Sequence, residues 1–139
     1  GVSEGLFFFF FLNKKGLLDA LVADAEKRLN DVFAHVVFET DPRQVIRKAI
    51  QLPFSVDEAD YNYWKLQFKL KWEQEYNSPN KVKPLVDKLA WAFAELGAED
   101  PESEAVVLQQ LIDSISVAIL RDELNQRHLE SFLLTKYNV

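Results

Sequence analysis

Apolar residues recur at intervals of three and four along most of this chain, the spacing that places them on one face of an α-helix. The first long stretch of this kind begins at Leu17 and continues to Val36. A final stretch begins near Gln126 and runs almost to the last residue. The pattern as a whole predicts an all-α chain. Its expected helices cover residues 13–37, 42–52, 56–76, 82–96, 101–121 and the segment that starts near residue 126.

Capping residues support several of these boundaries. Asp41-Pro42 and Asp100-Pro101 each combine an N-cap residue with a proline at the first helical position, where proline needs no amide hydrogen. Asn13 is the expected N-cap of the first long helix. Gly97 is expected to close the helix over 82–96, because glycine readily adopts the left-handed conformation that ends many helices.

Residues 56–76 fit two different periods. In the middle of this segment apolar side chains alternate with lysine or glutamine, as in an edge strand. Helical steps of three and four fit as well, and neither a β-branched residue nor a glycine occurs between Asp57 and Lys81. The segment therefore predicts a helix, opened by Ser55 and Glu58 at the spacing of a capping box.

The composition is that of a soluble globular domain. Of the 139 residues 48% are hydrophobic and 27% are charged, with only 4 Gly and 5 Pro, which excludes collagen-like and disordered chains. The absence of Cys excludes disulfide frameworks and cysteine zinc sites, and it favours a cytoplasmic protein. The apolar run Leu6–Leu12 is too short to cross a membrane and lacks the basic start of a signal peptide. We therefore expect no targeting segment and no membrane partner.

The beginning of the chain carries a pattern known from one protein family. Gly1-Val2-Ser3-Glu4-Gly5-Leu6 and a run of aromatic residues up to Phe11 precede Asn13-Lys14-Lys15-Gly16-Leu17-Leu18-Asp19-Ala20-Leu21. This stretch resembles the end of the helix-turn-helix in transcriptional regulators of the TetR (tetracycline-repressor-like) type. The resemblance implies a remnant of the DNA-binding domain, the recognition helix, over 1–12. It also implies a TetR-like C-terminal helical bundle, the effector-binding and dimerisation domain, over 13–139.

The same resemblance implies contacts to operator DNA. Two features limit them: phenyl rings replace the family's hydrogen-bonding side chains at Phe8 to Phe10, and the net charge of -6 disfavours attraction to phosphates. We therefore expect specific DNA binding of the full-length protein only. The expected contact residues are Ser3, Gly5, Leu6, Phe8, Phe10 and Lys14.

Aromatic side chains are concentrated between Tyr61 and Trp91, on two successive predicted helices. Such a stripe either packs the core or lines a pocket for an apolar or aromatic ligand. The resemblance favours the pocket, since the family binds small effectors between its central helices. The expected ligand-binding residues are Phe33, Tyr61, Trp64, Gln67, Phe68 and Trp91.

The helix predicted over 101–121 has two unusual faces. A broad apolar arc is expected to cover the core of the protomer, and it consists of Val107, Leu108, Leu111, Ile112, Ile115, Ala118 and Ile119. The opposite arc carries a single formal charge, which favours contact with another helix outside the protomer over contact with solvent. The alternative is a helix buried within one protomer. The resemblance implies a homodimer through the last two helices, with Val106, Gln109, Gln110, Asp113, Val117, Leu120, Leu129, Phe132, Leu133 and Tyr137 at its interface.

No pattern in the sequence indicates catalysis or metal binding. The two histidines, His35 and His128, are far apart in the sequence, and neither a nucleophile triad nor a glycine-rich phosphate loop occurs. We therefore expect no enzyme, no cofactor and no metal site. The leading hypothesis is a ligand-responsive transcriptional repressor with a small apolar or aromatic effector. The alternative is an all-α interaction or dimerisation module that binds neither ligand nor DNA.

Overall fold

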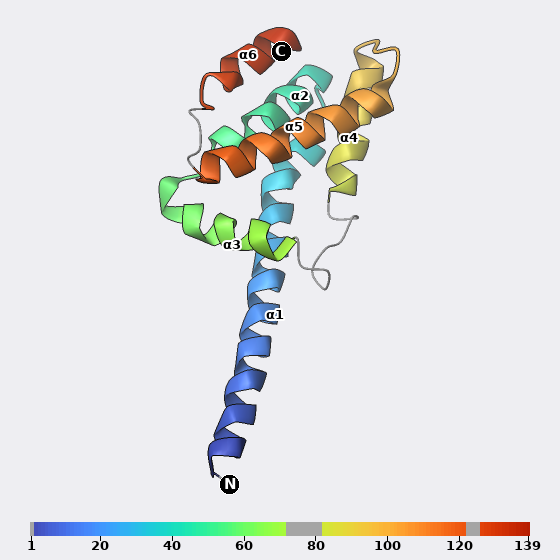
Figure 1. The fold of residues 1–139 in the computed structure, drawn as a ribbon. Coiled ribbons are helices and arrows are strands. Elements are labelled where there is room, and N and C mark those ends of the chain that lie inside the picture. The colour runs from blue at the N-terminus through green and yellow to red at the C-terminus, as the bar shows by residue number, and fades with distance from the viewer. Residues whose placement is uncertain (1, 72–81, 122–125) are drawn as a thin grey trace.

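The computed structural model describes residues 2–71, 82–121 and 126–139 (Figure 1). Its α-helices are α1 (Val2–Val37), α2 (Pro42–Gln51), α3 (Tyr61–Lys71), α4 (Lys83–Glu95), α5 (Pro101–Arg121) and α6 (Leu129–Lys136). Two short 3-10 helices, η1 (Leu52–Phe54) and η2 (Glu58–Asp60), connect α2 to α3. No strand occurs in these three stretches, and the predicted all-α class is confirmed.

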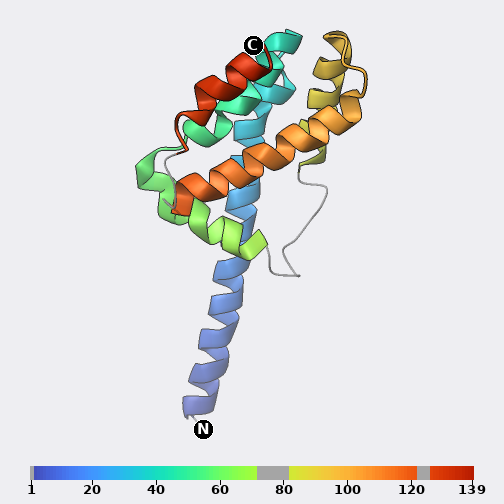
Figure 2. The same cartoon turned by 45° about the horizontal axis from the view of Figure 1, so that its top comes forward.

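α1 is a single helix of 36 residues whose N-terminal half projects away from the rest of the molecule (Figures 1 and 2). The predicted junction between a short recognition helix and a second helix capped by Asn13 is wrong, because Asn13 lies inside α1. No proline interrupts the helix, and no other described element lies beside its projecting half to bend it. The functional division of the chain at residue 12 stays a prediction.

The core lies where the C-terminal half of α1 meets α2, α4 and α5. α2 and α4 cross between the other two, and the most extensive helix contact joins α4 to α5. All four helices contribute side chains that are almost completely buried, among them Val36, Val45, Ile46, Ala49, Ile50, Leu85, Leu89 and Leu108. The helical stripes seen in the sequence thus converge on one apolar core.

α6 is held against α2 and α4 by both apolar and polar contacts. Leu133 is buried, and the Tyr137 ring lies 5.7 Å from that of Phe93 on α4. Arg43 and Arg47 of α2 donate hydrogen bonds of 3.0 and 3.1 Å to the carbonyl oxygens of residues 138 and 139. The last helix therefore belongs to the body of the molecule. It begins at Leu129, slightly later than predicted.

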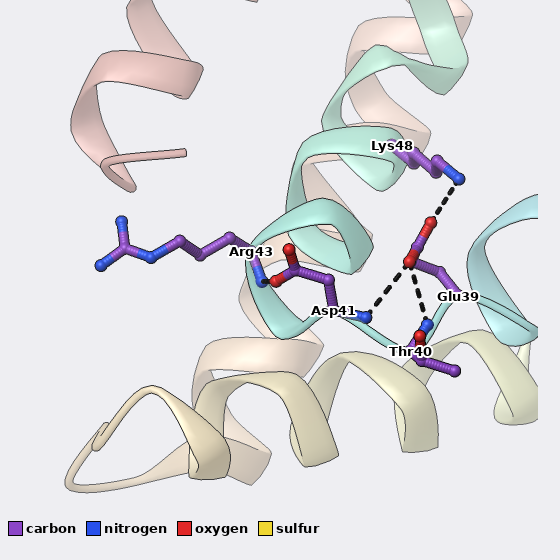
Figure 3. A network of polar contacts seen from close by, with 5 residues as sticks. All are labelled: Glu39, Thr40, Asp41, Arg43 and Lys48. Atoms are coloured by element: carbon purple, nitrogen blue, oxygen red, sulfur yellow. Dashed lines mark hydrogen bonds and ion pairs between the residues drawn. The ribbon is translucent and has the colours of Figure 1, made fainter.

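The two Asp-Pro pairs, Asp41-Pro42 and Asp100-Pro101, begin helices α2 and α5 as predicted. Asp41 accepts a hydrogen bond of 3.0 Å from the Arg43 amide at the start of α2 (Figure 3). Asp100 accepts one of 3.2 Å from the Ser103 amide at the start of α5, and contacts from Ser103 lower the pKa of the Asp100 carboxyl. Gly97, with φ of 86°, ends the helix before it as expected.

The segment after η1 departs from the prediction at its start. Ser55 does not cap a helix: its hydroxyl donates back to the Leu52 carbonyl oxygen at 3.0 Å and closes η1. Regular α-helix begins only at Tyr61, after η2, so the capping-box prediction is wrong. The choice of helix over strand is confirmed for Tyr61–Lys71, and residues 72–76 lie outside the described part.

α5 buries a different flank of its apolar arc from the one predicted. Leu108, Ile112, Ile115 and Ile119 are buried as expected, but Val107 is 49% exposed and Leu111 and Ala118 are only half-buried. Ala105 and Leu120 are buried in their place. A broad arc can be covered from either flank, and the packing of the neighbouring helices decides which flank that is.

Candidate functional site

The residues predicted to contact DNA all lie on the projecting half of α1. The side chains of these residues lie outside the described part of the structure, and their contacts with DNA stay a prediction.

The residues predicted to bind a ligand are only partly brought together. Phe33 and Tyr61 are half-buried and pack against the core, and Trp64 and Gln67 are half-buried on α3. The side chain of Phe68 lies outside the described part. Trp91 is 38% exposed on α4, and the Lys88 ammonium lies 4.2 Å from the centre of its ring. Trp91 is therefore a surface residue here, separate from the aromatic residues of α3.

α3 makes a polar cluster with α1 that the sequence did not predict. The Tyr63 hydroxyl donates a hydrogen bond of 2.9 Å to Oδ2 of Asp24. Arg28 forms an ion pair of 3.2 Å with the same oxygen, and its guanidinium lies 4.2 Å from the centre of the Tyr63 ring. Asp24 and Arg28 are recognisable as a helical i, i+4 pair. Their partner, 39 residues after Asp24, gives no local signal.

The Tyr63 hydroxyl keeps its proton in this cluster and donates it in the hydrogen bond to Asp24. Burial, and then the hydrogen bond to Asp24, raise the pKa of Tyr63 to about 12. The phenol therefore stays protonated throughout the physiological range. Trp64 also contacts this cluster. Its ring packs edge-on against that of Tyr63, with 5.2 Å between the ring centres.

α3 has a second polar link, to the segment that leads into α6. Arg127 Nη2 donates a hydrogen bond of 2.9 Å to the hydroxyl oxygen of Tyr61. Because Tyr61 only accepts in this contact, its own hydroxyl hydrogen can be donated elsewhere. The first turn of α3 therefore contacts α1 through one tyrosine and the approach to α6 through another.

Gln67 is the most unusual polar side chain of the candidate ligand site. Its Nε2 atom is buried and finds no hydrogen-bond partner among the described residues. Buried polar groups are nearly always paired, so such an atom needs an explanation. Gln67 follows Tyr63 by four residues, which places it one turn along the side of α3 that meets α1.

Two open hollows lie on the described surface between α1 and α2 and around their connection. Their volumes are about 360 and 420 Å³, and His35 and Lys48 border both of them. None of the residues predicted to bind a ligand lines either hollow. The predicted ligand site and these two hollows are therefore separate features.

The predicted dimer interface stays a prediction, and the structure shows how exposed its residues are within one protomer. On α5, Val106 is 44% exposed, Gln110 is exposed, and Gln109, Asp113 and Val117 are half-buried. Leu120 is buried within its own chain and is not free to meet a partner. α5 is also long and apolar enough, by length and composition, to cross a membrane, and 33% of its apolar stretch is buried in the molecule.

The α6 residues of the predicted interface point in different directions. Phe132 is 60% exposed and Leu129 is half-buried. Leu133 is buried, and Tyr137 contacts Phe93, so these two contribute to the core of their own protomer. Of the predicted interface residues 129, 132, 133 and 137, only Phe132 is therefore mainly exposed.

Three features therefore require a functional explanation: the contacts of α3 with α1, the Gln67 Nε2 atom that has no partner in the described part of the chain, and the outward face of α5. α3 takes part in the first two and also packs on α5. Comparison of the chain with protein-family models, with curated proteins and with solved structures finds no match.

Proposed function

We propose that this chain is the effector-binding and dimerisation part of a ligand-responsive transcriptional regulator of the TetR type, a repressor that binds operator DNA as a dimer when full length. The observation that carries the proposal is the buried Nε2 atom of Gln67 on α3, which has no hydrogen-bond partner among the described residues. α3 contacts both α1, which bears the N-terminal motif, and the approach to α6. A ligand held by Gln67 would act on the helix that links these two regions.

Gln67 favours a ligand that offers a hydrogen-bond acceptor. A buried NH2 group without an acceptor costs about 1–3 kcal/mol, so an acceptor oxygen bound there stabilises the complex by a comparable amount. Tyr61 and Trp64, on the two preceding turns of α3, supply rings suited to an apolar or aromatic body. The effector class is therefore a small, mainly apolar molecule with a carbonyl, ester or ether oxygen.

Dimerisation is supported by the outward face of α5. In both views α5 crosses the front of the molecule with no described element over it (Figures 1 and 2). Asp113 is the one charged residue between Ala105 and Leu120, although a solvent-facing helix normally carries several. The exposed side chains of Gln110 and Ser114 argue against lipid as the covering medium, because polar groups find no partners there. A second copy of α5 covers such a face and offers hydrogen-bond partners.

The alternative function is an interaction or dimerisation module without a ligand. It is favoured by the surface position of Trp91 and by the linings of the two described hollows, which include no residue of α3. The two functions share the dimer and differ in the ligand. A ligand experiment therefore separates them.

The test is thermal unfolding of the 139-residue chain with pairs of small aromatic compounds that differ in one acceptor oxygen, such as acetophenone and ethylbenzene. We expect the oxygen-bearing member of some pairs to raise Tm more than its hydrocarbon analogue. Gln67→Leu should remove this difference. It should also raise the stability of the ligand-free protein by about 1–3 kcal/mol, because it removes the unpaired amide.

Gln110→Leu, at an exposed position of α5, is the matched control for the loss of an amide. It should leave the preference between the paired compounds intact. If no pair shows a preference while the chain is a dimer, the interaction module becomes the better explanation. In the full-length protein, a compound that raises Tm should also release a duplex selected from a random-sequence pool.

A further inference from the structure

The two open hollows between α1 and α2 adjoin one another, because His35 and Lys48 border both of them. The smaller one, of about 360 Å³, is also lined by Phe38, just after the end of α1. The larger one, of about 420 Å³, extends back along α1 to Asp31 and reaches Leu52 of η1. Hollows of this size accommodate a small organic molecule. Since they share two bordering residues, one molecule can occupy parts of both.

The charged groups around these hollows leave one carboxylate without a partner. Nζ of Lys48 and Oε2 of Glu39 lie 2.5 Å apart and neutralise one another (Figure 3). The other oxygen of Glu39 already accepts hydrogen bonds from two backbone amides. The side chain of Asp31 forms no hydrogen bond or ion pair with the described residues. At about pH 7.5 an imidazole is mostly uncharged, so the linings of the hollows then carry a single unbalanced negative charge, that of Asp31.

Much of the remaining lining is apolar. Val32 and Leu52 border the larger hollow, and the methylene groups of Lys48 add apolar surface beside them. The Phe38 side chain is 81% exposed, more than any other large apolar side chain in the described stretches. A bound molecule that covers this ring removes apolar surface from water, and the face of an aromatic ring also attracts ammonium groups. The lining therefore suits a molecule with one cationic group and an apolar or aromatic body.

We propose that the two hollows form a binding site for an organic amine, with its ammonium group at Asp31 and its apolar body directed along α1 toward Phe38. These two residues lie roughly 10 Å apart along the helix axis, a length that an ammonium group joined to an aromatic ring by a short alkyl chain covers. His35 lies between them, one turn after Asp31, and an imidazole nitrogen can accept a second hydrogen bond from the ammonium group. No residue of α3 lines either hollow, so the site is separate from Gln67 and does not depend on the proposed function.

The test is an NMR titration of the isotope-labelled chain at about pH 7.5, because shifts of backbone amide signals both detect weak binding and locate it. Phenylbutylamine supplies the ammonium group, the alkyl chain and the ring. Phenylbutanol has a similar body but is neutral, and phenylbutyrate is an anion. We expect phenylbutylamine to shift the amide signals of residues that line the hollows. Phenylbutanol should bind about threefold to tenfold more weakly, as expected for the loss of a solvent-exposed ion pair, and phenylbutyrate more weakly still.

Two substitutions separate the contribution of the charge from that of the ring. Asp31→Asn should weaken the binding of phenylbutylamine about threefold to tenfold and leave that of phenylbutanol unchanged, since only the amine uses the carboxylate. Phe38→Ala should weaken both compounds to a similar extent, because both lose the same ring contact. Asp19→Asn removes another exposed carboxylate of the same helix and should change neither affinity. Circular dichroism of every variant verifies that the helices remain.

Three results would overturn the amine site. If phenylbutylamine keeps its advantage over phenylbutanol in Asp31→Asn, or has no advantage in the wild type, this carboxylate does not recognise the ligand. If phenylbutyrate binds most tightly, Lys48 and His35 hold an anion and the assigned class of ligand is wrong. If the amine shifts signals of α3 and Gln67→Leu abolishes these shifts, the amine occupies the proposed effector site. Binding in the hollows should be unchanged by Gln67→Leu, so each of the two sites can fail without the other.

Discussion

At the scale of single residues, Glu39 shows how much local structure one side chain can organise. Its Oε1 accepts hydrogen bonds of 3.0 and 3.1 Å from the backbone amides of Thr40 and Asp41, just before α2 (Figure 3). Its Oε2 accepts one of 2.5 Å from the ammonium of Lys48, in the last turn of the same helix. One carboxylate therefore satisfies two amides of the connection and ties that connection to the far end of α2.

These contacts predict an acid-dependent loss of stability. The hydrogen bond from Lys48, followed by those from the two amides, lowers the pKa of Glu39 from 4.5 to about 2. Because the pKa is lowered in the folded state, the stabilisation is complete above about pH 4.5 and is lost as the pH falls toward about 2. Urea unfolding at neutral pH should show Glu39→Gln to be less stable than the wild type, and this gap should narrow across that window. A gap that stays constant down to pH 2 contradicts the assignment.

At the scale of helices, α1 and the end of α4 show opposite uses of glycine. Gly16 lies inside α1, where a Cβ atom meets nothing within 4 Å. Gly97 follows the C-terminal end of α4 and has a φ of 86°, a conformation that other residues adopt only with strain. The same residue type therefore weakens one helix and ends another.

Alanine at these two positions should act in opposite directions. Gly16→Ala should raise the free energy of unfolding by about 0.5–1 kcal/mol, because alanine is the better helix former and nothing obstructs it. Gly97→Ala should lower it by about 1–2 kcal/mol, because its Cβ disfavours a positive φ. Chemical denaturation monitored by circular dichroism measures both changes. If both substitutions change the free energy of unfolding in the same direction, the helix assignments at these positions are wrong.

At the scale of the whole molecule, the outward face of α5 is the feature that a single protomer leaves unexplained. The helix buries Leu108, Ile112 and Ile119 inward, yet outward it presents Val106 and Gln110 and almost no charge. Contact with a second copy of the chain explains why the outward face of α5 carries so little charge although it is not buried within the protomer. It also removes apolar surface from water.

Val106→Glu should convert the proposed dimer into monomers. Two-fold symmetry places two copies of every interface residue in one contact, so one substitution buries two unpaired charges. Val106 is 44% exposed within its own chain, and the protomer should therefore fold normally. Ala94→Glu, at an exposed position of α4, is the control and should stay dimeric in sedimentation velocity. A wild-type chain that sediments as a monomer at micromolar concentration disproves the dimer.

The 139-residue chain by itself should bind duplex DNA no better than nonspecifically. Its net charge is -6, and the phenyl rings of Phe8 and Phe10 cannot donate hydrogen bonds to phosphate oxygens. Gel retention at physiological salt should show equal affinity for unrelated duplexes and a steep loss as salt is raised. Selective retention of one duplex would contradict this expectation and show that the chain itself recognises a DNA sequence.

Local chemistry allowed the sequence to predict much of the fold. The Asp41 and Asp100 caps, the stop at Gly97 and the helical class of the aromatic segment all depend on residues within a turn or two of each other. Such interactions operate in any helix, whatever surrounds it. Two local predictions failed, the N-cap at Asn13 and the capping box at Ser55 and Glu58, because a capping residue favours the start of a helix without imposing one.

By itself, then, the sequence determined the helices, most of their limits and the face of α5 with a single charge, since each depends on residues a few positions apart. Only the tertiary structure decided that Leu120 is buried while Val107 is exposed, that Trp91 lies on the surface, and that Tyr63 reaches Asp24. It also decided that the buried amide of Gln67 has no partner among the described residues. The physical reason is that burial and pairing depend on which distant side chains share a volume, and helical periodicity limits the candidates without choosing among them.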